Sequence, residues 1–233
     1  MATYVLIHGA SSDSWYWHLA APVLRKLGHD VVAPDLPCDD DAAGLAEYTD
    51  TVVKAIGTRT DLILVAQSLA GFTAPLVCER VKVDLLVMVA AMVPSPGESP
   101  GDWWRNTGFE KAKREQDKRD GRPANAPFDV KKIFFHDVPA KIVEAAFERG
   151  AKEQSGTPME KPWPLRKWPD VPTRFILCRH DRFFPADFMR RLVKERLGIT
   201  PDEMECGHLP ALARPRELVE RLERYRSELA PSR

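Results

Sequence analysis

The chain has 233 residues, which suits a single unit large enough to bury a substantial core. Hydrophobic residues make up 44% and charged residues 29%, a balance that excludes an intrinsically disordered chain. The 34 Lys and Arg residues match the 34 Asp and Glu residues, so the net charge is zero. That balance argues against nucleic acid and against an anionic membrane as partners.

Short apolar runs alternate with longer stretches of helical pattern along most of the chain. The runs are continuously apolar, as in strands that are buried on both faces of a parallel sheet. We predict strands at Tyr4–Ile7, Val31–Ala33, Leu62–Val65, Leu85–Ala91, Arg174–Cys178 and Glu203–Cys206. We predict helices at about Trp15–Leu27, Ala43–Ile56, Leu69–Arg80, Phe184–Leu197 and Arg216–Leu229. This alternation predicts an α/β fold with a doubly wound, mostly parallel sheet.

The alternation stops between residues 94 and 171. This segment holds many prolines and aromatic residues and a charged run from Glu110 to Arg122, so neither a linker nor a continued sheet fits it. We predict a core, residues 1–93 and 172–233, and a small helical cap insertion, residues 94–171. Ligands of open α/β sheets bind at the carboxyl ends of the strands, so an insertion that leaves a strand end would cover that site. A helical appendage packed elsewhere is the alternative.

The cysteines and the N-terminus bear on location. The cysteines are scattered, with neither a Cys-x-x-Cys pair nor metal-ligand spacing, at Cys38, Cys78, Cys178 and Cys206. The apolar run Val5–Ile7 lacks the basic lead-in of a signal peptide, and no apolar run approaches the length that spans a bilayer. We expect reduced thiols in a cytoplasmic protein, with a secreted, disulfide-bonded form as the alternative. The sequence leaves a homodimer open.

The strongest chemical signal is the run Leu62–Gly71, in which a strand ends at Ser68 and a helix begins directly after it. A nucleophilic serine on such a turn has a strained backbone, and its neighbours two residues away on either side must be small. Ala66 and Ala70 meet this need, although the common form of the motif has glycine at both positions. A serine that only caps the helix is the alternative.

The loop after the first strand, His8-Gly9-Ala10, supplies a second element. Acyl transfer develops a negatively charged oxygen, which needs two preorganised donors, usually backbone N–H groups. We expect these oxyanion donors at Leu69, directly after the serine, and at Ala10. A tight turn is the alternative reading of this loop, and we expect the imidazole of His8 to be structural.

Two further candidate side chains follow late strands. His208 comes after the last short strand, where its neutral imidazole can serve as general base for Ser68 if the sheet brings the strand ends together. Asp181 follows the strand Arg174–Cys178, and its carboxylate would hold that imidazole in the right tautomer. A surface histidine and a helix-capping aspartate are the alternatives, and Asp187 is a rival that we place within the next helix. The order Ser, Asp, His along the chain is that of α/β-hydrolases.

The chain resembles the plant methylesterase and hydroxynitrile lyase branch of the α/β-hydrolases. The likeness spans nearly the whole chain, is thin in the insertion, and is carried by Val5–Ala10, Trp15, Trp17, Leu27–Leu36 and Gly207–Pro215. The last of these is similar to the branch's Gly-His-Met-Pro-Met-x-x-x-Pro stretch. The resemblance implies an enzyme without a cofactor, whose triad is Ser68, Asp181 and His208 and whose oxyanion donors are Ala10 and Leu69.

These observations predict a serine hydrolase, an esterase that cleaves small apolar or aromatic carboxylic esters through an acyl-enzyme on Ser68. Aromatic side chains of the insertion would wall an apolar pocket. Lyases of this branch carry threonine where this chain has Gly9 and lysine where it has Leu209. Departing cyanide needs a nearby cation, which leucine cannot provide. A hydroxynitrile-lyase-like enzyme and a small-molecule binding protein with little turnover are the alternatives.

Overall fold

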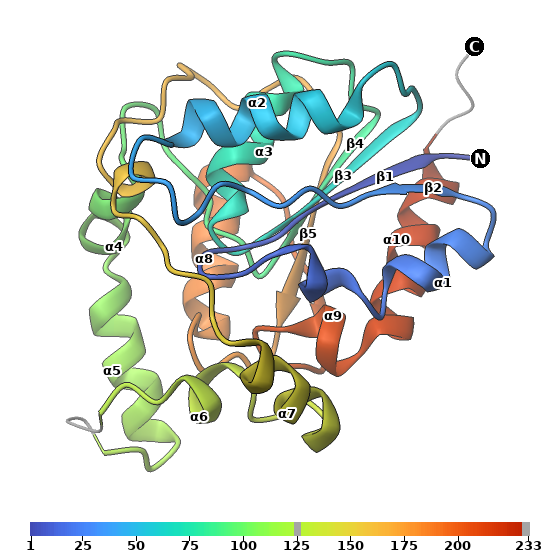
Figure 1. Cartoon of the computed structure of the whole chain (residues 1–233). Coiled ribbons are helices and arrows are strands. Elements are labelled where there is room, and N and C mark those ends of the chain that lie inside the picture. The colour runs from blue at the N-terminus through green and yellow to red at the C-terminus, as the bar shows by residue number, and fades with distance from the viewer. Residues whose placement is uncertain (124–126, 230–233) are drawn as a thin grey trace.

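A single parallel sheet organises the chain in the computed structural model, which describes residues 1–123 and 127–229 (Figure 1). The strand order is β2-β1-β3-β4-β5-β6, and each neighbouring pair is parallel. The strands are β1 (Thr3–Ile7), β2 (Asp30–Val32), β3 (Leu62–Gln67), β4 (Leu85–Val89), β5 (Thr173–Cys178) and β6 (Asp202–Met204). The predicted doubly wound α/β architecture is confirmed.

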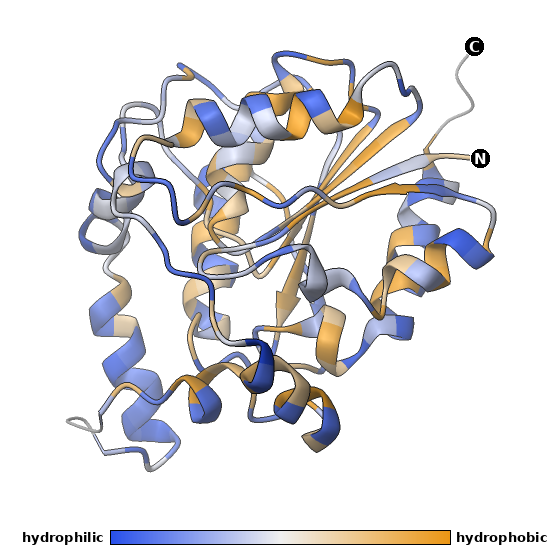
Figure 2. Cartoon of the chain, in the orientation of Figure 1, coloured by the Kyte–Doolittle hydropathy of each residue, from blue (hydrophilic) through white to orange (hydrophobic). Residues whose placement is uncertain are grey.

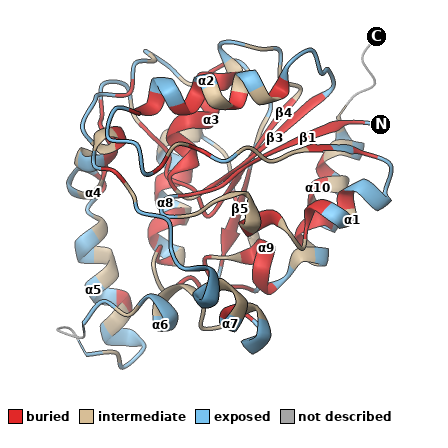
Figure 3. Cartoon of the chain, viewed as in Figure 1, coloured by how far each residue is buried: buried red, intermediate tan, exposed pale blue. Residues whose placement is uncertain are grey.

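Helices cover both faces of this sheet (Figure 1). One face packs against α2 (Leu45–Ile56), α3 (Ala70–Cys78) and α8 (Ala186–Leu197). The other packs against α1 (Ala21–Lys26), α9 (Pro210–Ala213) and α10 (Pro215–Glu228). Because both faces are buried, the central strands β1, β3 and β4 are almost entirely apolar, as Figures 2 and 3 show.

The alternation of side chains along each strand divides the core into two clusters. In β1, Val5 and Ile7 contribute to the cluster beneath α2, α3 and α8, whereas Tyr4 and Leu6 contribute to the cluster beneath α1 and α10. All four side chains are fully buried. A shift of β1 by one residue would exchange the two sets, so this pattern fixes the register.

The helix predicted for Trp15–Leu27 is interrupted. The chain forms a 3₁₀ turn, η1 (Ser14–Trp17), and then begins α1 at Ala21. The side chain of Asp13 caps η1 by accepting a hydrogen bond from the Trp15 amide at 2.9 Å. Pro22 lies in the first turn of α1, where its missing N–H is tolerated, whereas in the middle of a longer helix it would break the ladder.

The segment between β4 and β5 that we term the cap segment, residues 94–171, contains short helices. They are α4 (Pro100–Thr107), α5 (Phe109–Arg119), α6 (Val130–Phe134), α7 (Ala140–Arg149) and the 3₁₀ turn η2 (Thr157–Met159). Figure 1 shows α5, α6 and α7 beyond one end of the sheet. Two tryptophans fasten the segment to the core: Trp103 donates to the Val93 carbonyl at 3.0 Å, and Trp163 to the Phe72 carbonyl at 3.1 Å.

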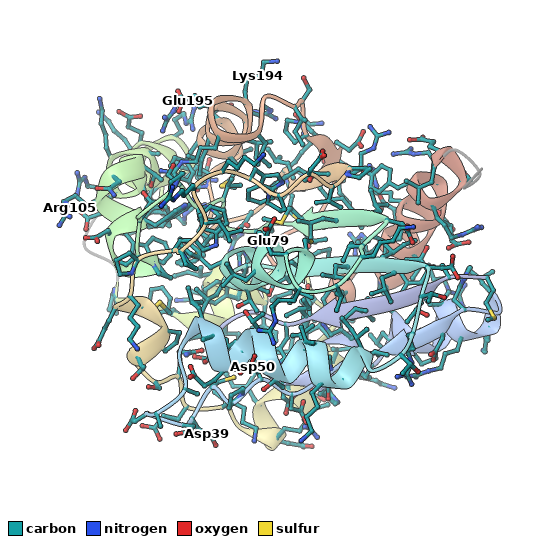
Figure 4. All side chains as sticks on the ribbon, turned by 90° about the horizontal axis from the view of Figure 1, so that it is seen from above. Asp39, Asp50, Glu79, Arg105, Lys194 and Glu195 are labelled. Carbon is teal, nitrogen blue, oxygen red and sulfur yellow. The ribbon has the colours of Figure 1, made fainter. Side chains whose placement is uncertain are left out.

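Charged side chains lie on the outer faces of the helices, as Figure 4 shows for Asp50 on α2, Arg105 on α4 and Lys194 on α8. Each of these residues is exposed, while the same helices bury apolar residues on their inner faces. Across residues 1–123 and 127–229, no helix combines the length and the apolar character needed to cross a membrane.

Candidate active site

The site lies where the chain reverses direction across the sheet. From β1 the chain goes to β2 on one side and returns to β3 on the other, and open α/β sheets bind ligands in the crevice at such a switch point. Ala10 follows β1, and Ser68 and Leu69 follow β3. Asp181 follows β5, and His208 follows β6. The structure therefore brings the predicted residues to one edge of the sheet.

Three of these side chains form a hydrogen-bonded chain. The Nδ1 atom of His208 lies 2.7 Å from Oδ2 of Asp181, and its Nε2 atom lies 3.1 Å from Oγ of Ser68. His208 is 3% exposed and Asp181 is 1% exposed, so solvent does not compete for the bond between them. The carboxylate accepts a hydrogen bond from the Nδ1–H group, which keeps the proton on Nδ1 and leaves Nε2 free to accept the proton of the serine hydroxyl.

Backbone amides hold the carboxylate of Asp181 in place. Its Oδ1 atom accepts hydrogen bonds from the Phe183 amide at 2.7 Å and from the Phe184 amide at 3.0 Å. Asp187, the rival carboxylate, lies in α8 as predicted and bonds with Arg119 on the surface. Only Asp181 of the two contacts the imidazole of His208.

Ser68 occupies the tight turn between β3 and α3 with a positive φ of 53°, a conformation that a residue other than glycine rarely adopts. From the sequence, small residues are required two positions before and after Ser68, and these are Ala66 and Ala70. The structure adds a stricter requirement at Gly71, where a Cβ atom would lie 1.9 Å from the carbonyl oxygen of Met92. The Met92 amide in turn donates to the Ser68 carbonyl at 3.0 Å, which locks the turn against the loop after β4.

The residues that carry the two predicted oxyanion donors, Ala10 and Leu69, line the same cavity as Ser68. Among the residues that the structure describes, neither the Ala10 amide nor the Leu69 amide has a hydrogen-bond acceptor. Gly9 allows the loop after β1 to approach: a Cβ atom there would lie 2.8 Å from Cβ of Ser68 and 2.4 Å from Oε1 of Gln67. Two amides beside a nucleophile are the arrangement that binds an oxyanion.

His8 is a structural residue, as expected. Its Nε2 atom accepts a hydrogen bond from the Leu36 amide at 3.0 Å, so the proton is on Nδ1, which donates to the Gly9 carbonyl at 2.8 Å. The side chain is fully buried, and this burial lowers the pKa of His8 below its usual value. A neutral imidazole therefore joins the loop after β1 to the chain that follows β2.

The lowered pKa of His8 predicts a pH-dependent stability. Between the folded pKa and the unfolded value of about 6.5, the unfolded chain binds a proton that the folded chain does not. The contribution of His8 to the free energy of unfolding is therefore complete above about pH 6.5. It is lost as the pH falls from there through the folded pKa. One proton gives a slope of at most about 1.4 kcal/mol per pH unit. Denaturant unfolding across this range should show a shallower decline in His8→Gln, and parallel curves would contradict the assignment.

A cavity of about 500 Å³ opens above Ser68. Its walls are mostly apolar and come from the loop after β1, from the cap segment and from the loop after β5. Three phenylalanine rings surround the imidazole of His208, with ring centroids 5.1–5.4 Å from its own, and they are Phe134, Phe183 and Phe184. Such rings restrict water around the base.

The cap segment contributes only some of its predicted aromatics to this cavity. Trp104, Phe134 and Phe135 line it, whereas Trp103 and Trp163 belong to the core. Phe128 and Phe147 of the cap segment also line the cavity, whereas Phe183, from the loop after β5, is an aromatic wall residue that the sequence did not indicate. Phe128 and Phe147 are exposed on the cap segment.

Comparisons with known proteins identify relatives over most of the chain. The model of the alpha/beta hydrolase family matches residues 4–221. Norfluorocurarine synthase 1 from Strychnos sp is 25% identical over 92% of this chain and 91% of its own length. Methyl jasmonate esterase 1 from Vitis vinifera is 25% identical over 92% of this chain and 93% of its own.

Solved structures share the fold. An extracellular alpha/beta-hydrolase from a Paenibacillus species superposes with a TM-score of 0.77 at 23% identity, covering 96% of this chain and 98% of its own. The relatives include plant methylesterases, which confirms the resemblance drawn from the sequence. The chain belongs to the alpha/beta hydrolase family.

Proposed function

We propose that this protein is a serine hydrolase that cleaves small apolar or aromatic carboxylic esters through an acyl-enzyme on Ser68. The observation that carries the proposal is the hydrogen-bonded chain from Asp181 through His208 to Ser68, beside the amides of Ala10 and Leu69. We assign the three side chains as a catalytic triad and the two amides as an oxyanion hole.

The reaction proceeds in two steps. The Ser68 oxygen attacks the ester carbonyl while His208 takes the hydroxyl proton, and the amides of Ala10 and Leu69 stabilise the oxyanion. His208 then gives its proton to the departing alcohol, which leaves an acyl-enzyme. A water molecule attacks this ester with His208 again as base, and the carboxylic acid departs as the serine regains its proton. Asp181 stabilises the imidazolium that forms in each step.

The cavity supports an apolar ester as substrate. Trp104, Phe134 and Phe183 contribute aromatic wall beside the nucleophile, and a volume of about 500 Å³ suits a small molecule. Among relatives that match over most of their length, methyl jasmonate esterase 1 is named for ester hydrolysis, which supports the same reaction class here.

The cavity gives less support to a cyanohydrin lyase. Leu209, which replaces the lysine of the lyases, lines the cavity and carries no charge. Gly9 stands where the lyases carry threonine, and in this chain even a Cβ atom at that position would clash with Ser68. Two cationic side chains, Arg149 and Lys152, also line the cavity, but Arg149 pairs with Asp13 at 2.9 Å and Lys152 is exposed to solvent, which screens its charge. We therefore expect no cleavage of an aromatic cyanohydrin.

A fluorophosphonate probe tests the nucleophile directly. We expect one phosphonyl adduct, mapped by mass spectrometry to Ser68, and hydrolysis of p-nitrophenyl acetate that falls at least about 10³-fold in Ser68→Ala. The unfolding temperature of the variant, measured alongside, shows that the loss is chemical. A wild-type protein with no adduct would sink the acyl-enzyme mechanism and leave the lyase and the binding protein.

We also propose a cytoplasmic location and a division into a core and a helical cap, residues 94–171. The four cysteines are free thiols, and three of them are buried, which supports a reducing compartment. Cell fractionation tests the location, and enrichment of the protein outside the cytoplasm would overturn it.

A further inference from the structure

Three polar side chains of the cap segment bond to the backbone beside three different parts of the candidate site. Each bond joins residues at least 65 positions apart in sequence. The pairs are Gln116 with the Asp181 carbonyl at 3.0 Å, Asp137 with the Gly207 amide at 2.6 Å, and Gln154 with the Ser11 amide at 3.2 Å. The cap segment thus contacts the loops that carry the acid, the base and an oxyanion donor.

The contact of Asp137 is the most constrained. Its Oδ2 atom accepts the amide proton of Gly207, the residue directly before His208, in a charge-assisted bond. A Cβ atom on Gly207 would lie 2.6 Å from Oδ1 of Asp137 and 2.7 Å from Nε2 of His136. With any other residue at this position, the side chains of Asp137 and His136 would have to move away from the loop that carries His208. This close contact fixes the backbone from which the imidazole of His208 projects.

The contact of Gln116 is independent evidence. α5 is a highly charged helix, and Gln116 is its buried residue. The Nε2 atom donates to the carbonyl of Asp181, while Oε1 is buried and has no partner in the described part of the chain. Burial of an amide with one unpaired oxygen costs free energy. The hydrogen bond from Gln116 to the Asp181 carbonyl offsets part of that cost.

Gln154 completes the pattern at the oxyanion loop. Its Oε1 atom accepts from the Ser11 amide, and its Nε2 atom donates to the Tyr48 hydroxyl at 3.0 Å, so it connects this loop to α2. Ser11 adopts a positive φ of 53°, a conformation that needs support from its surroundings. Ser11 directly follows Ala10, whose amide we assign to the oxyanion hole.

We propose that Asp137 is a positioning residue for the base His208, and that Gln116 and Gln154 position the acid and the oxyanion loop in the same way. The cap segment therefore lines the cavity and also fixes the positions of the three catalytic loops relative to one another. This inference rests on the proposed esterase function. A displacement of about 1 Å costs on the order of 10²-fold in rate, so small shifts of these loops suffice to impair turnover.

The test compares Asp137→Ala with Asp137→Asn in the full-length protein. We expect Asp137→Ala to lower kcat for p-nitrophenyl acetate about 10- to 100-fold, with KM within about twofold, and to slow phosphonylation of Ser68 in parallel. Asp137→Asn keeps an acceptor oxygen for the Gly207 amide and should recover most of the loss. An unchanged kcat in Asp137→Ala would overturn the inference, as would an Asn variant as impaired as the Ala variant.

A second variant covers the case in which Asp137→Ala does not fold. Gln116→Met keeps the shape of the side chain and removes its donor, and Lys118→Met, on the exposed face of the same helix, is the matched control. We expect a several-fold loss of kcat without a change in KM in Gln116→Met only. Equal kcat in the two methionine variants would overturn the inference. If wild-type Ser68 takes no phosphonyl group, the proposed function fails instead.

Discussion

Asp181→Asn is expected to lower kcat for ester hydrolysis about 10⁴-fold in a protein that still folds. The asparagine carbonyl takes over the bonds from the Phe183 and Phe184 amides, so its NH₂ group faces Nδ1 of His208. Nδ1 must then accept, the proton moves to Nε2, and Nε2 can no longer take the proton of Ser68. The variant thus has the right shape and the wrong tautomer.

Steady-state hydrolysis of p-nitrophenyl acetate measures this effect, and circular dichroism shows that the variant is folded. Asp187→Asn is the matched control, because Asp187 pairs with Arg119 and Arg190 on the surface and does not contact the imidazole. A loss of only a few fold in Asp181→Asn, or an equal loss in the control, would remove Asp181 from the triad.

Gly71→Ala is expected to destabilise the fold by about 3 kcal/mol or more. The added methyl group would lie 1.9 Å from the carbonyl oxygen of Met92 and 2.9 Å from its carbonyl carbon. Both neighbours are backbone atoms, and the Met92 amide is bonded to the Ser68 carbonyl, so no side-chain rotation relieves the contact. Either α3 or the loop after β4 must shift, and Ser68 lies between them.

Denaturant unfolding of Gly71→Ala beside Gly156→Ala tests this expectation. Gly156 has a negative φ, and a Cβ atom there meets no atom within 4 Å, so the control substitution should be close to neutral. Equal midpoints for the two variants would show that the turn at Ser68 is not closely packed. A destabilised Gly71→Ala protein should also hydrolyse esters more slowly, because the nucleophile moves with its turn.

The sequence indicated the three residues of the proposed triad because each lies within a few positions of the end of a strand. Continuous apolar runs predict parallel strands, and parallel strands bring their carboxyl ends to one edge, where Ser68, Asp181 and His208 meet. The glycine of the loop after β1 and the order Ser, Asp, His along the chain independently favoured the same fold and site. Local pattern and topology were therefore sufficient for the part of the site built by the sheet.

The part of the site built by the cap segment was not predictable in this way. Aromatic composition gives no sign that Trp104 faces the cavity while Trp103, its neighbour in sequence, is buried in the core. Asp137 and Gln116 reach their partners across 70 and 65 positions of sequence, and neither belongs to a motif or a periodic pattern. Such contacts depend on the paths of irregular loops, and these paths leave no recognisable pattern in a single sequence.

Because β4 and β5 pair directly, the cap segment between them can vary in length and in the pocket that it forms with little effect on the sheet. The two strands pair directly although the whole cap segment separates them in sequence. The entropy lost on closing a flexible connection grows only logarithmically, by about 0.6 kcal/mol for each doubling of its length. A longer cap that keeps Trp103 and Trp163 would therefore weaken the sheet little. Under the role proposed for Asp137, turnover also requires that the new cap again offer an acceptor to the Gly207 amide. Variation in pocket shape is then thermodynamically easy but catalytically constrained.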